Sequence, residues 1–316
     1  MPEQNNASAK RFAVMDLGTN TFHLLIAEKS TEGFRIVHQQ TEAVKIGEGG
    51  INKGIIQQAA FSRGIKAMQD FKKHIDEAAA TEVRAIATSA LRNAANGNDF
   101  IAEVKAQAGI QIEIIDGAKE AAFIYKGIEA SGVLTEKNSL IVDIGGGSVE
   151  FIIGNEDETL WKQSFEIGAA RLMDKFHKVD PMNVVSIKAM TAYLNQQLVP
   201  LFQAAMQYKP TFLIGSSGAF ESFAEVIELE AGRKFDLKST KSYEFDTDDL
   251  LYLIERLIKS THAKRATMKG IIPVRVDMIV SASLLTIYLM QKLGLVDVWM
   301  STYSLKEGVL AEMMGR

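Results

Sequence analysis

Two short apolar runs of the chain are each broken by a tight turn of small or polar residues. Residues 140–154, LIVDIGGGSVEFIIG, predict a buried strand over 140–144, a turn over 145–148 and a second strand over 149–153. The runs are short, β-branched and bounded by glycine, which favours strands over helices. Residues 13–27, AVMDLGTNTFHLLIA, follow the same pattern of apolar and polar positions. The sequence therefore predicts two β-hairpins of one design.

The two segments align with one constant offset and without a gap. Asp16 aligns with Asp143 and His23 with Glu150, and the apolar positions on both sides match. An internal repeat of this kind predicts two similar domains that each offer one turn to a shared cleft. Because a histidine stands in the first copy where the second has an acid, any metal site between the hairpins should be asymmetric.

The rest of the chain alternates between strand and helix patterns. Apolar runs predict further strands over 34–41, 82–88, 111–115, 159–166, 211–214 and 296–300. Helical spacing of apolar residues predicts helices over 55–79, from Asn98 or Asp99 to 108, from 118, and over 168–177, 181–207, 219 onward, 273–293 and 305–314. Asn98 or Asp99 is the expected cap of its helix. Strands that alternate with helices indicate an α/β fold.

Composition narrows the class of protein. The chain has 316 residues, of which 47% are hydrophobic and 23% charged, enough for two domains with their own cores. It has no cysteine, which excludes disulfides, thiolate metal ligands and a cysteine nucleophile. The net charge of −4 argues against a nucleic-acid binder but allows a polyanionic substrate in a locally basic cleft. Without a long apolar run or a signal-like N-terminus, we expect a cytoplasmic protein with no membrane contact.

The two turns are candidates for phosphate binding. Glycines at 145–147 leave backbone N–H groups with no side chains in front of them, so this turn can close around a phosphate. In the first turn, Thr19, Asn20 and Thr21 can add side-chain donors. Asp143 and Glu150 flank the second turn, and Mg²⁺ is commonly bound by one or two carboxylates and phosphate oxygens. The alternative is a glycine-rich hairpin with solvated acids, which the repeat disfavours.

Two charged residues follow predicted strands. Arg92 lies past the strand over 82–88, at the edge of an α/β sheet where ligands bind, and a guanidinium there suits a phosphate. It could equally be a surface arginine at a helix end. Glu120 lies in the first turn of its helix, where acids also suit the helix dipole. Its functional interpretation is a general base for an attacking water. Lys119 beside it could bind phosphate or be solvated.

Two further stretches leave alternatives open. Residues 215–218, Gly-Ser-Ser-Gly, stand between a strand and a helix and could bind an anion at the helix N-terminus or be a plain connection. The turn lacks the lysine of a P-loop, so Walker-type ATP chemistry is not supported. Residues 259–270, KSTHAKRATMKG, are basic without an acid, which suits a solvated helix face or a wall that attracts a polyanion.

Six motifs occur in a fixed order: DLGTNTFHLLI, ATSALRNA, IIDGAKEA, VDIGGGSVEF, IGSSGAF and SLKEGVL. In this combination the chain resembles the exopolyphosphatase / guanosine pentaphosphate phosphohydrolase family, within the superfamily of actin, hexokinase and the heat-shock ATPases. The resemblance implies two ribonuclease-H-like (actin-like ATPase) α/β domains with the active site in the cleft between them. We expect residues 1–125 in the first domain, with the helix at 303–316 packed back on it, and 126–302 in the second.

The resemblance also implies an activity. It is removal of the terminal phosphate from inorganic polyphosphate, or of the 5′ γ-phosphate from pppGpp, with Mg²⁺ or Mn²⁺. Glu120 would be the catalytic base, Arg92 would bind phosphate during catalysis, and Asp143 and Glu150 would hold the metal, with Glu150 also positioning water. The expected phosphate-binding residues are Asp16, Gly18, Thr19, Asn20, Thr21, Gly145, Gly146, Gly147, Ser148, Gly215, Ser216, Ser217 and Gly218.

The chain departs from the family pattern at several positions. Lys119 stands where the family often has a second acid, Ala219 replaces a threonine, and Lys306 replaces the usual arginine. Because the helical C-terminal domains of longer members do not follow, we do not expect processive action on long polymers. A kinase or ATPase of the same superfamily and a non-catalytic sensor of alarmone or polyphosphate remain alternatives. The retained acids at 120, 143 and 150 favour a hydrolase, and family analogy suggests a homodimer.

Overall fold

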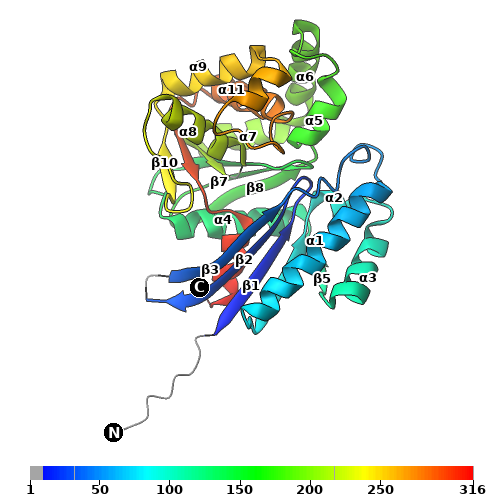
Figure 1. Cartoon of the computed structure of the whole chain (residues 1–316). Coiled ribbons are helices and arrows are strands. Elements are labelled where there is room, and N and C mark those ends of the chain that lie inside the picture. Colours follow the sequence, from blue (N-terminus) through cyan, green and yellow to red (C-terminus); the bar gives the residue numbers. More distant parts are fainter. Residues whose placement is uncertain (1–9, 32, 217, 316) are drawn as a thin grey trace.

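Two β-sheets, each flanked by helices, organise the chain. A computed structural model of the protein describes residues 10–31, 33–216 and 218–315. We call the elements around the first sheet the first lobe and those around the second sheet the second lobe. Figure 1 shows the second lobe above the first, with α1 and α3 beside the first sheet and α12, in red, behind its strands. This arrangement confirms the α/β class.

The first sheet has five strands in the order β3-β2-β1-β4-β5. They are β1 (Arg11–Leu17), β2 (Phe22–Ser30), β3 (Gly33–Glu42), β4 (Glu82–Ala87) and β5 (Ile112–Ile114). Strand β2 is antiparallel to both of its neighbours, β1 and β3. Strand β4 pairs in parallel with β1, and β5 pairs in parallel with β4. In β1, Ala13, Met15 and Leu17 face the helices of one side, whereas Phe12 and Val14 face the other. The alternation of apolar residues in this strand therefore reflects burial on both faces of the sheet.

The second sheet has six strands in the order β10-β11-β9-β6-β7-β8. They are β6 (Ser139–Ile144), β7 (Val149–Gly154), β8 (Thr159–Phe165), β9 (Phe212–Ser216), β10 (Ser242–Glu244) and β11 (Val298–Ser301). Strands β6, β7 and β8 are antiparallel, and β9 pairs in parallel with β6. The strand order and directions around β6 therefore repeat those around β1, as expected of two ribonuclease-H-like units.

Helices cover both sheets. In the first lobe they are α1 (Gln58–Glu77), α2 (Ser89–Arg92) and α3 (Gly97–Ala108). In the second they are α5 (Ala169–Phe176), α6 (Val184–Gln197), α7 (Val199–Tyr208), α8 (Gly218–Glu230), α9 (Thr247–Lys259), α10 (His262–Thr267) and α11 (Ile279–Leu293). Helices α4 (Gly117–Ser131) and α12 (Leu305–Met313) belong to neither set. Among the helices that the structure describes, none has the length and apolar character needed to cross a membrane.

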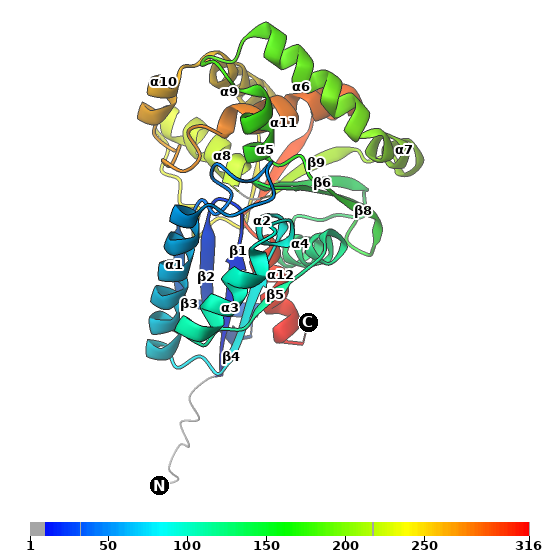
Figure 2. The ribbon, with the colours of Figure 1, turned by 90° about the vertical axis from the view of Figure 1, so that its right-hand side faces the viewer.

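Helices α4 and α12 form a layer that the two sheets share. Their apolar side chains join one core with Val14 of β1 and with Ile141 of β6, and Figure 2 shows α4 at the junction of the lobes and α12 running from there along the first sheet. The helix backbones touch, since a Cβ on Gly127 would lie 2.0 Å from the Ser304 carbonyl oxygen and one on Gly308 would lie 1.8 Å from that of Phe123. Only glycine permits this approach. The predicted domain limits, 1–125 and 126–302, stay predictions.

Several predicted boundaries are wrong. The single helix expected over 181–207 is two helices that meet at Leu198, because Pro200 lies at the start of α7 and cannot continue the hydrogen bonds of α6. The helix expected from Pro273 begins at Ile279, after a series of turns. Helix α3 begins at Gly97 without a cap from Asn98 or Asp99.

Two predictions about polar stretches also need correction. The strand expected to end at Ile214 continues through Gly215 and Ser216, so the first half of the expected Gly-Ser-Ser-Gly turn is strand, and Gly218 already begins α8. In the basic stretch 259–270, Arg265 is neither solvated nor part of a basic wall, since only 1% of its side chain is exposed. Its guanidinium donates to Asp180, 2.7 Å away, and to the Val276 carbonyl, 2.8 Å away. A buried arginine is stable there because its charge and its donors are matched.

Candidate active site

The turn of the first hairpin is closed by its own backbone. Asp16 stands opposite His23 in the strand register, and the Gly18 N–H donates to the Thr21 carbonyl at 3.1 Å. The His23 ring lies 2.8 Å from Thr21 Oγ1 and 2.9 Å from Thr41 Oγ1, so it is held on both sides. Burial, with the cations Lys306 and Arg275, lowers the pKa of His23 to about 3. The ring is therefore neutral near pH 7 and adds no charge of either sign.

The turn of the second hairpin is tied to helix α5. Asp143 stands opposite Glu150, in the same register as Asp16 and His23. The N–H groups of Gly168, Ala169 and Ala170 donate to the carbonyls of turn residues 145–147 at 2.9–3.1 Å. A Cβ on Gly168 would lie 2.4 Å from the Gly146 backbone, so the helix can approach only because this residue is glycine.

The two turns meet across the lobes. A Cβ on Gly146 would lie 2.2 Å from Asn20 Nδ2, and one on Gly147 would lie 2.7 Å from Thr19 Oγ1. The glycines of the second turn therefore make room for the hydroxyl and amide side chains of the first. The structure brings most predicted site residues to one pocket between the turns, namely Asp16, Gly18, Thr19, Asn20, Thr21, Glu120, Asp143, Gly145, Gly146, Gly147, Ser148, Glu150 and Gly218.

Three acids line this pocket: Asp143 and Glu150 are buried, and Asp16 is partly buried. Asp143 Oδ2 accepts from Ser216 Oγ at 2.9 Å and from Ser304 Oγ at 2.5 Å. Glu150 Oε1 accepts from Ser164 Oγ at 2.6 Å. Burial raises the pKa of Asp143, and it raises that of Asp16 to about 7. Burial and the nearby charges of Glu120 and Asp143 raise the pKa of Glu150 well above its ordinary value.

Glu120 and Arg92 form an ion pair at the edge of the pocket. Asp116 caps α4 by accepting from the Lys119 N–H at 2.8 Å, which places Glu120 in the first turn of the helix. Arg92 Nη1 donates to Glu120 Oε2 at 2.9 Å and to the Ile115 carbonyl at 3.0 Å. Burial outweighs the arginine and raises the pKa of Glu120 to about 8. A raised pKa makes the ionised carboxylate a stronger proton acceptor, which suits a general base.

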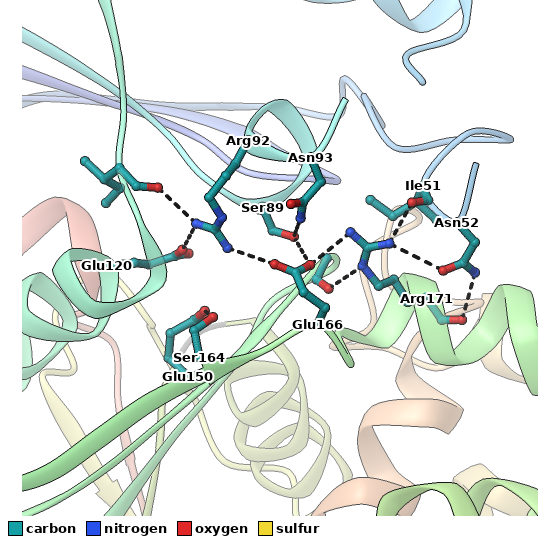
Figure 3. Close-up of polar contacts among 12 residues, drawn as sticks. Ile51, Asn52, Ser89, Arg92, Asn93, Glu120, Glu150, Ser164, Glu166 and Arg171 are labelled. Carbon is teal, nitrogen blue, oxygen red and sulfur yellow. Dashed lines mark hydrogen bonds and ion pairs between the residues drawn. The ribbon is translucent and has the colours of Figure 1, made fainter. Parts of the chain in front are cut away.

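Glu166 and Arg171 extend this ion pair beyond the residues that the sequence singled out. Figure 3 shows Glu166 between Arg92 of the first lobe and Arg171 of the second. Arg171 Nε also donates to the Gly147 carbonyl of the second turn at 2.8 Å. The local sequence around residue 166 carries no signal for this role, since an acid just past a strand end is ordinary. The contact depends on the packing of one lobe against the other.

A buried lysine also lines the pocket. Lys306 lies in the first turn of α12, its side chain is 13% exposed, and its Nζ is 3.1 Å from Glu307 Oε1. Burial alone would lower the pKa of Lys306, but Glu307, Glu221 and Asp16 raise it overall. The pocket therefore holds a fixed positive charge close to Asp16. Lys119, by contrast, pairs with Glu113 at 2.5 Å on the surface.

The structure places the residues of the 215–218 stretch differently from the prediction. Ser216 is fully buried at the end of β9 and supports Asp143 instead of lining a phosphate turn. Gly215 packs against a ring, because a Cβ there would lie 2.1 Å from Phe220. Gly218 lines the pocket, next to the Arg275 guanidinium. The prediction for Ser217 falls outside the described residues.

The acids of the pocket fit a hard divalent cation. In the described parts of the chain, no group of three or more His, Cys, Asp or Glu side chains is arranged as a metal site of its own. Asp143 and Glu150 nevertheless carry carboxyl groups that burial and mutual repulsion destabilise as anions. Mg²⁺ commonly takes one or two carboxylates and completes its shell with water and substrate phosphate. Asp143 and Glu150 are therefore the residues that could hold such an ion.

Solved structures share this fold over nearly the whole chain. An exopolyphosphatase from Cytophaga hutchinsonii superposes with a TM-score of 0.94 and is 41% identical, with 96% of this chain and 98% of that chain covered. The Aquifex aeolicus PPX-GPPA enzyme superposes with a TM-score of 0.78 at 23% identity, over 96% of this chain and 99% of that chain. These likenesses confirm the two-domain actin-like fold that the motifs predict.

Two curated relatives match nearly the whole chain. Exopolyphosphatase 2 of Mycobacterium tuberculosis is 27% identical over 96% of this chain and 99% of its own length. A guanosine-5′-triphosphate,3′-diphosphate pyrophosphatase of Aeromonas hydrophila is 24% identical over 96% of this chain. The chain spans only 59% of that relative's length. The sequence pattern of the Ppx/GppA phosphatase family matches residues 25–316, and the chain belongs to this family.

Proposed function

We propose that the protein hydrolyses the terminal phosphoanhydride bond of inorganic polyphosphate, of pppGpp, or of both. The contact between the two turns carries the proposal, because it gathers backbone N–H groups and the side chains of Thr19 and Asn20 around one pocket beside Glu120. Such a pocket suits a phosphate group, and a carboxylate beside it suits the activation of water. The names of the two relatives, exopolyphosphatase and guanosine-5′-triphosphate,3′-diphosphate pyrophosphatase, support the same reaction class.

The reaction we propose is a direct transfer of a phosphoryl group to water. The two turns bind the terminal phosphate, and Glu120 orients a water and accepts its proton. The water oxygen forms a bond to phosphorus while the bond to the bridging oxygen breaks, and the shortened chain leaves with that oxygen. Arg92 holds the carboxylate of Glu120 through its 2.9 Å contact. Positioning and electrostatics supply most of the rate in reactions of this kind.

The proposal includes Mg²⁺, with Asp143 and Glu150 as its protein ligands. When bound, Mg²⁺ supplies positive charge against the phosphate oxygens. The protein's own contribution is to orient these ligands, since Ser216 and Ser304 fix Asp143 and Ser164 fixes Glu150. A cytoplasmic location and a homodimer also stay proposals, which cell fractionation and size-exclusion chromatography would test.

The decisive experiment measures phosphate release on four substrates in parallel: tripolyphosphate, long-chain polyphosphate, pppGpp and ATP, with and without Mg²⁺. We expect release from polyphosphate or pppGpp, lost after chelation of the metal and restored by its return. Glu120→Gln should lower kcat by a factor on the order of 10²–10⁴, because it removes the base but retains the shape. Glu129→Gln, an exposed acid on the same helix, is the matched control and should leave kcat unchanged.

The other outcomes have distinct meanings. Fast release from ATP alone, stimulated by an acceptor, would favour a kinase. Tight binding of pppGpp or polyphosphate without release would favour a sensor. Near-normal turnover in Glu120→Gln would remove Glu120 from the role of base.

A further inference from the structure

Glu166 lies in a cradle of donors that come from both lobes. Its Oε1 accepts from Arg92 Nη2 at 3.1 Å, and its Oε2 accepts from Arg171 Nη2 at 2.9 Å and from Ser89 Oγ at 2.6 Å. Figure 3 shows the carboxylate between the two arginines, with Asn93 next to Ser89, to which its amide donates at 3.3 Å. Two guanidinium groups and a hydroxyl around one pair of oxygens are the donors that commonly bind phosphate.

Arg92 and Arg171 each have hydrogen-bond partners other than Glu166. Arg92 is also held by Glu120 at 2.9 Å and by the Ile115 carbonyl at 3.0 Å. Arg171 also donates to the Gly147 carbonyl at 2.8 Å and to the Ile51 carbonyl at 2.7 Å. Each guanidinium is therefore held by at least two oxygen atoms other than those of Glu166. The cradle is thus preorganised for an anion.

The carboxylate, in contrast, is on the open side of the cradle. The side chain of Glu166 is 44% exposed, whereas those of Arg92 and Arg171 are 18% and 14% exposed. Burial raises the pKa of Glu166, but hydrogen bonds from Ser89, Asn93 and Arg92 lower it overall, so the group is an anion near neutral pH. An exposed anion on a short side chain can leave for solvent, and a phosphate of higher charge can take its place.

The cradle is continuous with the phosphate pocket. Arg171 contacts the carbonyl of Gly147, and a Cβ on Gly147 would lie 2.5 Å from Ser89 Oγ. The second turn therefore has the pocket on one side and the cradle on the other. A substrate of linked phosphates that enters the pocket would pass this point, whereas a single phosphate could fill only one of the two places.

We propose that Ser89, Arg92 and Arg171 form a further phosphate subsite, which binds an inner phosphate of the substrate after displacing the Glu166 carboxylate. This inference rests on the proposed function, since it takes the substrate to be a chain of linked phosphates. Glu166 acts as an internal competitor, and it makes the site select substrates with at least two phosphates over monophosphates.

The test compares Glu166→Gln and Arg171→Ala with the wild type in phosphate release from tripolyphosphate with Mg²⁺. Glu166→Gln should lower KM by about threefold, because the substrate no longer competes with a charged carboxylate. Arg171→Ala should raise KM by about tenfold with a smaller change in kcat, because it removes a charge-assisted hydrogen bond to the substrate. Glu230→Gln is the matched control, since Glu230 pairs with Arg256 in the second lobe at a similar exposure of 46%, and it should keep the wild-type KM.

The Kd of tripolyphosphate, measured by calorimetry, tests the subsite independently of whether the protein hydrolyses this substrate. If no protein, wild type included, releases phosphate, the proposed function fails, but Kd must still fall in Glu166→Gln and rise in Arg171→Ala. An unchanged or raised KM and Kd in Glu166→Gln would mean that Glu166 only joins the lobes, and would overturn the subsite. Glu166→Gln decides alone if Arg171→Ala proves unfolded by circular dichroism.

Discussion

The hairpins of the two lobes share a backbone but differ in charge. In each, an aspartate is the last but one residue of the first strand, and a Cβ on the first glycine of the turn would lie 3.0 Å from the carbonyl oxygen of the residue that closes the turn. Across the strands, however, the first hairpin has the neutral ring of His23 and the second has the carboxyl group of Glu150. The duplicated scaffold thus carries two different chemistries.

The residues around Asp16 and Asp143 also differ in polarity. On the parallel neighbour strand, Ile86 stands beside Asp16, and Ser216 stands beside Asp143. Asp143 therefore receives from this neighbour a hydroxyl donor that Asp16 lacks, whereas Lys306 lies near both aspartates. The comparison teaches that the second lobe carries and orients Asp143 and Glu150, while the first turn supplies neutral donors. Lys306, on the shared helix α12, adds a cation near both aspartates. A single divalent cation bound on the second lobe fits this division.

The largest expected effect is a difference in kcat between substitutions at the matching positions of the two hairpins. Glu150→Gln should lower kcat by a factor on the order of 10², since it removes a charge next to the reacting phosphate. His23→Gln should lower kcat by less than about tenfold, because His23 contributes hydrogen bonds but no charge. Phosphate-release assays measure both, with Glu158→Gln, an exposed acid between β7 and β8 of the second lobe, as the control. Equal losses in the two variants would contradict the division of roles.

A second prediction concerns stability. Gly215 of β9 occupies the register position that Ala85 occupies in β4, yet a Cβ at 215 would lie 2.1 Å from the Phe220 ring. Gly215→Ala should therefore lower the free energy of unfolding by about 3 kcal/mol, a cost typical of overpacking. Urea unfolding measures it. The double variant Gly215→Ala, Phe220→Leu should recover part of the loss, and no recovery would show that the ring is not the cause.

The smallest expected effect is a loss of stability that should be equal in the turns of the two hairpins. Gly18→Ala and Gly145→Ala each bring a Cβ to 3.0 Å from a backbone oxygen, of Thr21 and Ser148. Both should lower the free energy of unfolding by about 1 kcal/mol, as a mildly strained turn does. Thermal melts of the two variants side by side check the equality. A clear difference would show that the turns do not share one backbone conformation.

Much of the fold could be predicted from the sequence because its signals are local. Periodic apolar residues marked most strands and helices, and the repeat marked the two hairpins. The failures lie where a local pattern was ambiguous. The helical pattern over 181–207 is interrupted at Leu198, just before a helix with a proline in its first turn. The small residues at 215 and 216 continue a buried strand instead of forming a turn.

The candidate site divides in the same way. The residues of the two turns, with Glu120, Asp143 and Glu150, were found from their positions at strand and helix ends, and the structure brings them to one pocket. Their roles stay proposals. Glu166, Arg171 and Ser216 acquire their contacts from partners that are distant in sequence, and no local pattern announces such contacts.

The sequence by itself determined the duplicated hairpins with their two turns and the order of most strands and helices, because backbone preference and apolar periodicity act over a few residues. Only the tertiary structure decided which side chains meet between the lobes. The shared layer of α4 and α12 sets the lobes against each other through the close contacts at Gly127 and Gly308. That packing, and not any local signal, places Arg92 and Arg171 around a single carboxylate.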